Sequence, residues 1–235
     1  MRIAGVDEAG RGAVIGPLVV AGVAVQEEKQ DLLKKLGVRD SKLLSPKRRE
    51  SLAKKIETIA DQIVLISLSP CRIDNGRGDG HNLNRLEVEK FADVINLLKP
   101  EKAIVDAVDV QESRFAALIR AQLSEPLKKI DIVSEHKADT NHVIVGAASI
   151  IAKVARDQAI EEIKKKYGDV GPGYSSNEIT IAWLKRWYAE HKSWPDIVRR
   201  SWDTARVIAG EKQQKGILGF LKKRADPCDS KAQSP

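Results

Sequence analysis

The chain has 235 residues, 42% of them hydrophobic, only 4% aromatic, and a net charge of +7. This length suits one large domain with a C-terminal extension, whose core must be packed mainly from aliphatic side chains. No apolar run approaches membrane-spanning length and no basic-then-apolar leader opens the sequence, so we expect a cytoplasmic protein without a membrane partner.

The positive charge is concentrated towards the C-terminus. Residues 185–224 contain eleven Lys or Arg against four Asp or Glu, whereas residues 1–184 contain 28 against 27. This excess predicts a polyanionic partner, although a solvated basic surface is the alternative. The two cysteines, Cys71 and Cys228, lack metal-ligand spacing, and we expect both thiols to be reduced.

Taken in chain order, the first predicted element is a buried strand at residues 3–6, which delivers Asp7 and Glu8 to a turn containing Gly10-Arg11-Gly12. Buried carboxylates are costly unless they are paired or bind a metal. Glycine backbone N–H groups and an arginine can hold a phosphate or sugar beside such a metal. The alternative is a strand that ends in a polar surface turn.

Apolar periodicity and turn signals place the remaining elements. We predict further strands at residues 17–25, 62–68, 102–105 and 130–133, and helices at 27–36, 45–60, 84–98, 113–123, 141–166, 177–191 and 203–210. Ser45 is the expected cap of one helix, Ser175 with Glu178 that of another, and residues 74–79 read as a glycine-rich loop. The order predicts a mixed five-stranded α/β sheet with helices on both faces, in which the turn at Gly16-Pro17 makes the first two strands an antiparallel hairpin; the first and fourth strands can be neighbours if the first three form an antiparallel meander.

Three predicted strands lead to acids: Asp7 and Glu8 after the first, Asp106 after the fourth and Asp139 beyond the fifth. If the first and fourth strands are neighbours, four carboxylates converge at one edge of the sheet and repel one another unless cations neutralise them. Oxygen-only ligands suit Mg²⁺ or Mn²⁺, and two such ions can support phosphodiester cleavage. Unrelated surface acids are the alternative.

Five motifs occur in a fixed order: DEAGRG from Asp7, DSK from Asp40, VDAVDV around Asp106, HKAD ending at Asp139 with the following AASIIAKVARD, and GPGY ending at Tyr174. Together they resemble ribonuclease HII of the archaeal type, over about residues 1–206. The resemblance implies a ribonuclease H-like catalytic domain at 1–166, a helical substrate-binding part at 167–210 and a tail at 211–235. It also implies a metal-dependent endoribonuclease that cleaves the RNA strand of RNA–DNA hybrids. The same enzyme would cut 5′ to ribonucleotides embedded in DNA, leaving 3′-hydroxyl and 5′-phosphate ends.

The same resemblance assigns roles to residues. Asp7, Glu8, Asp106 and Asp139 match the family's metal-binding acids, with Asp106 preferred over the nearby Asp109 because it lies directly at the strand end. The loop Gly10-Arg11-Gly12 matches the segment that reads the ribose 2′-hydroxyl and its phosphate, and Tyr174 the ring that packs on the next deoxyribose. Without the resemblance, Tyr174 would be a structural loop residue. Further substrate contacts are expected at Asp40, Ser41, Lys42, Asn84, Lys137 and Ser149.

Several residues keep two interpretations. His136 either moves protons or is structural, and Asn84 and Ser149 either touch the substrate or serve helix capping and packing. The residues Arg199, Arg200, Ser201 and Thr204 are candidates for binding the nucleic-acid backbone. The four tryptophans, at 183, 187, 194 and 202, are expected in the core rather than as stacking platforms, since Trp183 and Trp187 have helical spacing.

The tail contains a separate pattern, in which Gln214, Ile217, Phe220 and Leu221 resemble a sliding-clamp-binding peptide. The alternative is a last amphipathic helix that packs on the domain. Two rival functions also remain: a related nuclease that cuts DNA junctions, which would not need Gly-Arg-Gly with Tyr174, and a hybrid-binding protein without activity, which would not need four converging acids.

Overall fold

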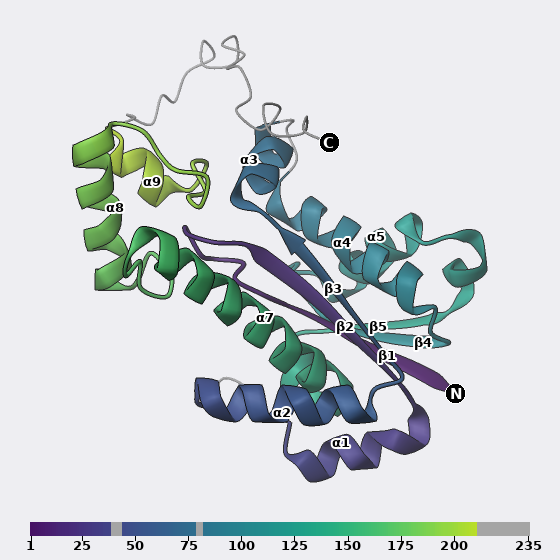
Figure 1. Cartoon of the computed structure of the whole chain (residues 1–235). Helices are drawn as coiled ribbons and strands as arrows, with labels where there is room; N and C mark the ends of the chain where they lie inside the picture. The colour runs from purple at the N-terminus through teal and green to yellow at the C-terminus, as the bar shows by residue number, and fades with distance from the viewer. Residues whose placement is uncertain (39–43, 79–81, 211–235) are drawn as a thin grey trace, which may run out of the picture.

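The computed structural model of the chain describes residues 1–38, 44–78 and 82–210. Its centre is a five-stranded sheet of order β3-β2-β1-β4-β5 (Figure 1). The strands are β1 (Arg2–Ala9), β2 (Leu18–Gln26), β3 (Gln62–Leu68), β4 (Lys102–Asp106) and β5 (Asp131–Glu135). β1, β2 and β3 pair antiparallel, while β4 is parallel to both β1 and β5. This confirms the predicted hairpin of the first two strands, fulfils the condition for the first and fourth strands to be neighbours, and puts the carboxyl ends of β1 and β4 side by side.

Helices cover both faces of the sheet, as predicted. They are α1 (Gln30–Leu36), α2 (Pro46–Ile59), α3 (Pro70–Gly78), α4 (Leu83–Leu98), α5 (Glu112–Gln122), α6 (Ala138–Asn141), α7 (Val143–Tyr167), α8 (Glu178–His191) and α9 (Asp203–Ile208). Two 3₁₀ turns, η1 (Glu27–Lys29) and η3 (Glu125–Lys129), precede α1 and β5. Ser45 caps α2 as expected, since its side chain accepts a hydrogen bond from the N–H of Arg48.

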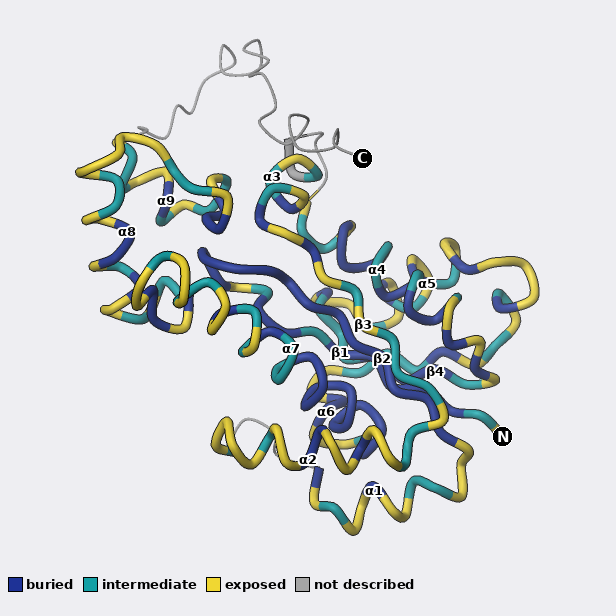
Figure 2. Tube along the Cα trace, in the orientation of Figure 1, coloured by how far each residue is buried: buried dark blue, intermediate teal, exposed yellow. Residues whose placement is uncertain are grey.

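Alternate residues of β1 enter two different cores. Ile3 packs with α7, α2 and α1 on one face, whereas Ala4 and Val6 pack with α4 and α5 on the other. The first half of α7 is almost entirely buried (Figure 2). It lies so close to β1 that a Cβ atom on Gly5 would come within 2.4 Å of the carbonyl carbon of Ile144. The glycine at this position therefore permits direct contact between the backbones of strand and helix.

A third core joins the far end of α7 to α8 and α9, which stand together beyond one end of the sheet in Figure 1. Trp183 is only 2% exposed, and the other three tryptophans pack against buried neighbours in this region. Trp183 stacks on Trp187 with their ring centroids 5.1 Å apart. These contacts confirm Trp183 as a core residue, whereas Trp187, Trp194 and Trp202 are partly buried against this core.

The predictions for residues 74–78 and for two helix starts were wrong. Residues 74–78, expected in a loop, belong to α3, because the Asp74 carboxylate accepts hydrogen bonds from the backbone N–H groups of Arg200 and Ser201 and so fixes that segment. The start of α4 is capped by Asn82, so Asn84 lies within the helix. The start of α8 is capped by Asn177, because Ser175 instead bonds the hydroxyl of Thr204.

The predicted helix at residues 141–166 corresponds to α7, which begins two residues later, and the short helix α6 precedes it. His142 between them is extended, with φ −118° and ψ 115°, and its ring contacts the Glu135 carboxylate at 2.7 Å. Cys71 is not a free thiol in the structure, which corrects the expectation of a reduced cysteine there, and Cys228 lies outside the described residues. Within the described part of the chain, no helix is both long and apolar enough to cross a membrane.

Candidate active site

Asp7 and Glu8 point to opposite faces of β1, because neighbouring side chains alternate along a strand. Asp7 meets α7, where the Ser149 hydroxyl donates it a hydrogen bond, and its Oδ1 also accepts the N–H of Glu8 at 2.7 Å. Burial and the nearby Asp106 charge raise the pKa of Asp7 to about 7. Burial, Asp7 and Glu87 raise the pKa of Glu8 well above its usual value. Both acids are thus costly to ionise in the absence of a cation.

Asp106 ends β4, parallel to β1, and completes this group electrostatically, since its charge raises the pKa of both Asp7 and Glu8. Its Oδ1 accepts the backbone N–H of Ala138 at 2.8 Å, which fixes the carboxylate at the start of α6. Asp139 follows on α6 and is 4% exposed. We call Asp7, Glu8 and Asp106 the acid edge. The hydrogen bond from the N–H of Ala138 to Asp106 holds α6, the helix that carries Asp139, against this edge.

The acid edge fits a hard cation by the chemistry of its donors. It offers carboxylate oxygens only, its charges repel one another, and the buried Oε2 of Glu8 has no hydrogen-bond partner within the described residues. Among all the residues that the structure describes, no three His, Cys, Asp or Glu side chains are close enough together to surround an ion. Such an open arrangement suits Mg²⁺, which is usually held by one or two carboxylates, water and substrate phosphate rather than by a closed protein cage.

Asp109, the alternative to Asp106, is occupied elsewhere. Its carboxylate accepts the N–H of Gln111 at 3.1 Å and pairs with the Arg114 guanidinium at 2.9 Å. These donors hold the pKa of Asp109 below its usual value. Its visible contacts therefore shape the turn before α5.

The Gly-Arg-Gly loop (Gly10 to Gly12) is held from below by a buried arginine. Arg199 is fully buried and donates from Nη2 to the Gly10 carbonyl at 2.7 Å, from Nη1 to the Arg11 carbonyl at 2.9 Å and from Nε to the Gly16 carbonyl at 3.1 Å. Burial lowers the pKa of Arg199 to about 9, so it remains protonated at neutral pH. Gly10 has φ +85°, and a Cβ there would come within 2.6 Å of the Pro17 carbonyl oxygen, so a side chain is excluded.

The Arg11 side chain is 40% exposed and is held along one edge by α4. Its Nε donates to Oε2 of Glu87 at 3.0 Å, and its Nη2 donates to Oδ1 of Asn84 at 2.6 Å. Glu87 was missed by the sequence analysis. A signal was present, because Glu87, Phe91, Val94 and Leu98 share the buried face of α4, and an acid on such a face needs a partner.

Tyr174 lies beside the Gly-Arg-Gly loop, because its backbone forms a bridge with Ala13. Its half-buried ring stacks against the guanidinium of Arg156, 4.5 Å from the ring centroid. Arg156 is 4% exposed and also donates to the Pro172 carbonyl, so it fixes the ring and the loop that carries it. Sequence reasoning missed Arg156 because nothing in its position on α7 shows that it faces a distant loop.

The other predicted contacts are placed as follows. Ser149 is buried, and its hydroxyl accepts a hydrogen bond from the Lys153 ammonium at 2.7 Å. The same hydroxyl donates to Asp7, so the visible role of Ser149 is to hold the Asp7 carboxylate. Lys137 is exposed, in a left-handed conformation with φ 60° before α6. The His136 ring contacts the carbonyl of Ala107 at 3.2 Å, in agreement with its structural interpretation.

The four C-terminal candidates for binding the nucleic-acid backbone fall into two groups, those that contact the protein itself and one that is exposed. Arg199 donates hydrogen bonds to the protein's own backbone. The Ser201 hydroxyl bonds the Asp74 carboxylate, and the Thr204 hydroxyl bonds that of Ser175. Arg200, in contrast, is exposed. Residues predicted in two other segments lie outside the described part of the chain: Asp40, Ser41 and Lys42, and the tail residues Gln214, Ile217, Phe220 and Leu221.

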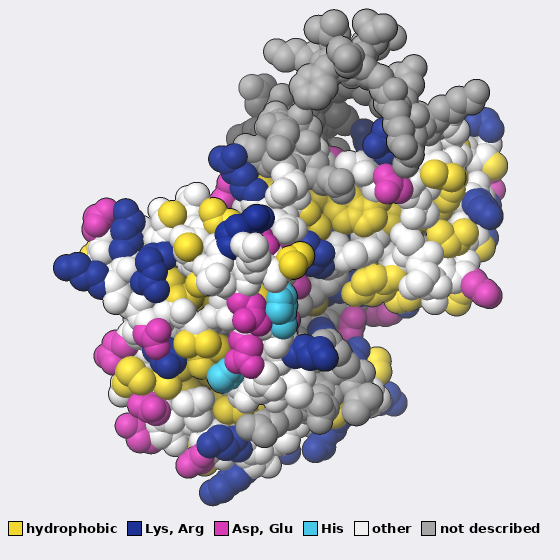
Figure 3. All heavy atoms as spheres, turned by 180° about the vertical axis from the view of Figure 1, so that it is seen from behind, with side chains coloured by type: hydrophobic (Ala, Val, Ile, Leu, Met, Phe, Trp, Pro, Cys, Tyr) yellow, Lys and Arg dark blue, Asp and Glu magenta, His cyan; other side chains and the backbone are white. Residues whose placement is uncertain are grey.

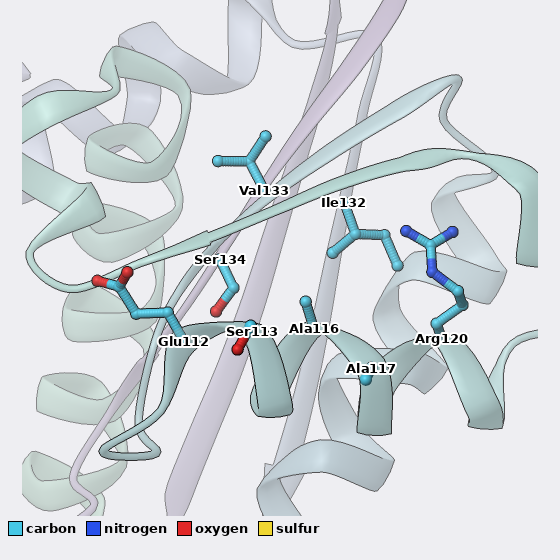
Figure 4. Close-up of a pocket in the computed structure, with 8 residues that line it drawn as sticks. All are labelled: Glu112, Ser113, Ala116, Ala117, Arg120, Ile132, Val133 and Ser134. Atoms are coloured by element: carbon cyan, nitrogen blue, oxygen red, sulfur yellow. The ribbon is translucent and has the colours of Figure 1, made fainter.

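Charged groups of both signs share the face opposite to that of Figure 1, with Asp, Glu and His side chains near its middle and Lys and Arg around them (Figure 3). A pocket of about 470 Å³ lies between α5 and β5, and contains none of the predicted site residues (Figure 4). The two charged residues that line it are already engaged: Glu112 accepts the N–H of His136 and Arg120 donates to two backbone carbonyls. We therefore place the candidate site at the acid edge and the Gly-Arg-Gly loop.

Comparison with known proteins agrees with this assignment. A model of the family described as Ribonuclease HII matches residues 4–205. Ribonuclease HII of Thermococcus sibiricus is 48% identical over 229 residues, covering 95% of this chain and 100% of the relative. That of Pyrococcus furiosus is 47% identical with the same coverage.

Solved structures agree as well. The ribonuclease H2 from Pyrococcus horikoshii OT3 matches with a TM-score of 0.83 at 46% identity, covering 89% of this chain and 98% of that one. An RNase HII from Archaeoglobus fulgidus, solved in a complex with PCNA, matches at 0.79 and 43% identity, covering 93% and 100%. Bst-RNase HIII in complex with Mn²⁺ has a similar fold, with a TM-score of 0.72 at 21% identity, covering 90% and 71%.

The mixed sheet, with acids at the ends of two parallel strands, defines the fold as ribonuclease H-like. The chain belongs to the ribonuclease HII family, which confirms the resemblance stated from the sequence. It is an enzyme, an endonuclease of the hydrolase class with ribonuclease H activity.

Proposed function

We propose that this ribonuclease depends on two divalent ions, Mg²⁺ or Mn²⁺, held by Asp7, Glu8, Asp106 and Asp139. The carrying observation is the acid edge itself, where burial and the charge of Asp106 raise the pKa of Asp7 to about 7, and where an oxygen of Glu8 has no hydrogen-bond partner among the residues that the structure describes. When bound, the ions would activate a water molecule and stabilise the leaving oxygen of the cleaved phosphodiester.

The chain's own groups prepare this chemistry by positioning. Ser149 and the N–H of Glu8 fix Asp7, and the N–H of Ala138 fixes Asp106, so the acids are oriented before substrate arrives. No side chain acts as a covalent nucleophile in this proposal, and the protein supplies geometry and electrostatics.

We propose further that the enzyme hydrolyses the RNA strand of hybrids and cuts 5′ to ribonucleotides embedded in duplex DNA, leaving 3′-hydroxyl and 5′-phosphate ends. The Gly-Arg-Gly loop would read the 2′-hydroxyl and its phosphate, since a hydrogen bond to that hydroxyl distinguishes RNA from DNA locally. Tyr174 would pack on the following deoxyribose. The support is their placement, because Tyr174 is joined to this loop through Ala13 and both are rigidly braced.

The test uses an end-labelled DNA duplex carrying one ribonucleotide. We expect one cut 5′ to the ribonucleotide in Mg²⁺, abolished by chelator and by Asp7→Asn, while Asp7→Asn still binds the duplex. Cleavage of a long RNA–DNA hybrid without cleavage of this duplex would contradict the junction-reading role of Arg11 and Tyr174. Binding without cleavage of either substrate by the unmodified protein would favour a binding protein.

The tail proposal concerns a partner. We propose that Gln214, Ile217, Phe220 and Leu221 bind a sliding clamp, with support from the Archaeoglobus fulgidus relative solved with PCNA. Removing residues 211–235 should abolish binding to the clamp, measured by calorimetry, and leave cleavage of a short duplex unchanged. Binding that survives this truncation would refute the assignment.

The domain division at residues 1–166, 167–210 and 211–235 is likewise our proposal, with the second part supporting the substrate strand. We propose that the enzyme works in the cytoplasm on DNA under replication and repair, since its substrates occur there.

A further inference from the structure

Glu87 is a buried acid on α4 that forms an ion pair with Arg11. It is fully buried on α4, and within the described residues only one of its oxygens, Oε2, has a hydrogen-bond partner, the Nε of Arg11 at 3.0 Å. A buried carboxylate that leaves an oxygen unsatisfied costs stability, so packing alone does not explain its presence.

Glu87 works together with Asn84, one turn earlier on the same face of α4. Their acceptors bind Nε and Nη2 of Arg11, which fixes one edge of the planar guanidinium. A guanidinium has five N–H donors, so the Arg11 group keeps further donors, and its side chain is 40% exposed. The unused edge is thereby presented to solvent in one orientation.

The backbone of Arg11 is fixed independently. Arg199 donates to its carbonyl and to that of Gly10, so the loop beneath the guanidinium is braced. With the backbone held by Arg199, the contacts from Glu87 and Asn84 decide where the guanidinium points.

We propose that Glu87 is a positioning residue for substrate recognition, which acts through Arg11 and not on the substrate itself. Together with Asn84 it holds the guanidinium so that its free donors face the phosphate and 2′-hydroxyl of the ribonucleotide. A bidentate contact of this kind depends strongly on orientation, because both donors must meet their acceptors at once. This inference rests on the proposed function, in which the Gly-Arg-Gly loop reads the ribonucleotide.

The test is a double-mutant cycle between Glu87 and Arg11. For wild type, Glu87→Met, Arg11→Met and the double variant, kcat and KM are measured on a duplex with one ribonucleotide. We expect Glu87→Met to raise KM about ten-fold with kcat within about two-fold, and to have no further effect in the Arg11→Met background. Glu87→Gln keeps an acceptor for Nε and should recover most of the loss.

The chain offers a matched control. Asp109 and Arg114 also pair a buried acid with an exposed guanidinium, their side chains being 5% and 59% exposed, but this acid shapes the turn before α5 and does not hold the Gly-Arg-Gly loop. Asp109→Asn should leave kcat and KM unchanged. If thermal unfolding shows that Glu87→Met does not fold, Asn84→Ala enters the same cycle in its place.

The outcomes separate this inference from the proposed function. Equal effects of Glu87→Met with and without Arg11, or a loss confined to kcat, would overturn the positioning role while the enzyme still cuts the duplex. If the unmodified enzyme does not cut the duplex in Mg²⁺, the proposed function fails and the inference fails with it.

Discussion

The acid edge and the Gly-Arg-Gly loop adjoin each other in the chain, but their charges are handled in opposite ways. At the acid edge, the charge of Asp106 raises the pKa of both Asp7 and Glu8, and Asp7 raises the pKa of Glu8 further. In the loop, Arg199 donates to the carbonyls of Gly10 and Arg11, and Glu87 and Asn84 hold the side chain of Arg11.

The difference indicates what each region still needs. The loop is preorganised by the protein, so substrate can bind it without much reordering. The acid edge is electrostatically unfavourable by itself and becomes stable only when cations arrive. Four measurements can break or sharpen this contrast.

The largest effect is expected at the acid edge. Asp106→Asn should reduce cleavage by about 10³-fold or more, because it removes a charge that would hold a metal ion, whereas Asp109→Asn should stay within about two-fold. Single-turnover cleavage of the ribonucleotide duplex measures both. A comparable loss in the Asp109 variant would show that Asp106 had been chosen wrongly.

The next effect is on stability, and it belongs to the loop. Arg199→Met removes a charged donor from three carbonyls and should reduce the free energy of unfolding by roughly 3–5 kcal/mol. Urea denaturation measures this change. The neighbouring Arg200→Met, whose side chain is exposed, should stay within about 0.5 kcal/mol and serves as the control.

The third prediction concerns pH. Because the pKa of Asp7 is raised to about 7 in the folded state, the folded protein binds more protons than the unfolded chain between about pH 4 and 7, so metal-free stability should fall as pH rises through this range. Mg²⁺ binds the ionised acids, so the rise in Tm that it causes should be larger at pH 8 than at pH 5.5. In the metal-free protein, Asp7→Asn should raise Tm at pH 8 by on the order of 5 °C. A Tm gain from Mg²⁺ that is the same at both pH values would contradict this account.

The smallest effect is expected from Ser149→Ala. The Ser149 hydroxyl lowers the pKa of Asp7, so its loss should move the acidic limb of the pH–rate profile to higher pH and slow cleavage a few-fold at pH 7. Rate profiles at saturating Mg²⁺ measure the shift. An unchanged profile would mean that Ser149 serves packing alone.

Local patterns predicted the sheet well. Alternation along residues 62–68 and the turn signals at Gly16 and Pro17 give the meander, and once β1 and β4 are neighbours the acids at their ends must be close. The family resemblance favours Asp106 over Asp109, because it places the ligand directly at the strand end. The roles of these acids as ligands remain predictions.

Long-range contacts explain what was missed. The glycines at 76 and 78 favour a loop, but Asp74 is held by the backbone of residues 200 and 201, and α3 forms. Arg156 and Glu87 each serve a partner at least 16 residues away in the chain, which no local pattern specifies. Buried charge on a helix face is a usable signal, although it does not identify the partner.

The direct contact of Gly5 with Ile144 has a consequence for anyone who would transplant this site. The motif from Asp7 to Gly12 is not a portable unit, because Asp7 depends on Ser149, which is carried by the helix that begins beside Gly5. In a saturation library selected for cleavage, position 5 should tolerate glycine alone, since any side chain would lift α7 off the strand. A designer must therefore copy the strand and its helix together, at backbone contact, before adding a single acid.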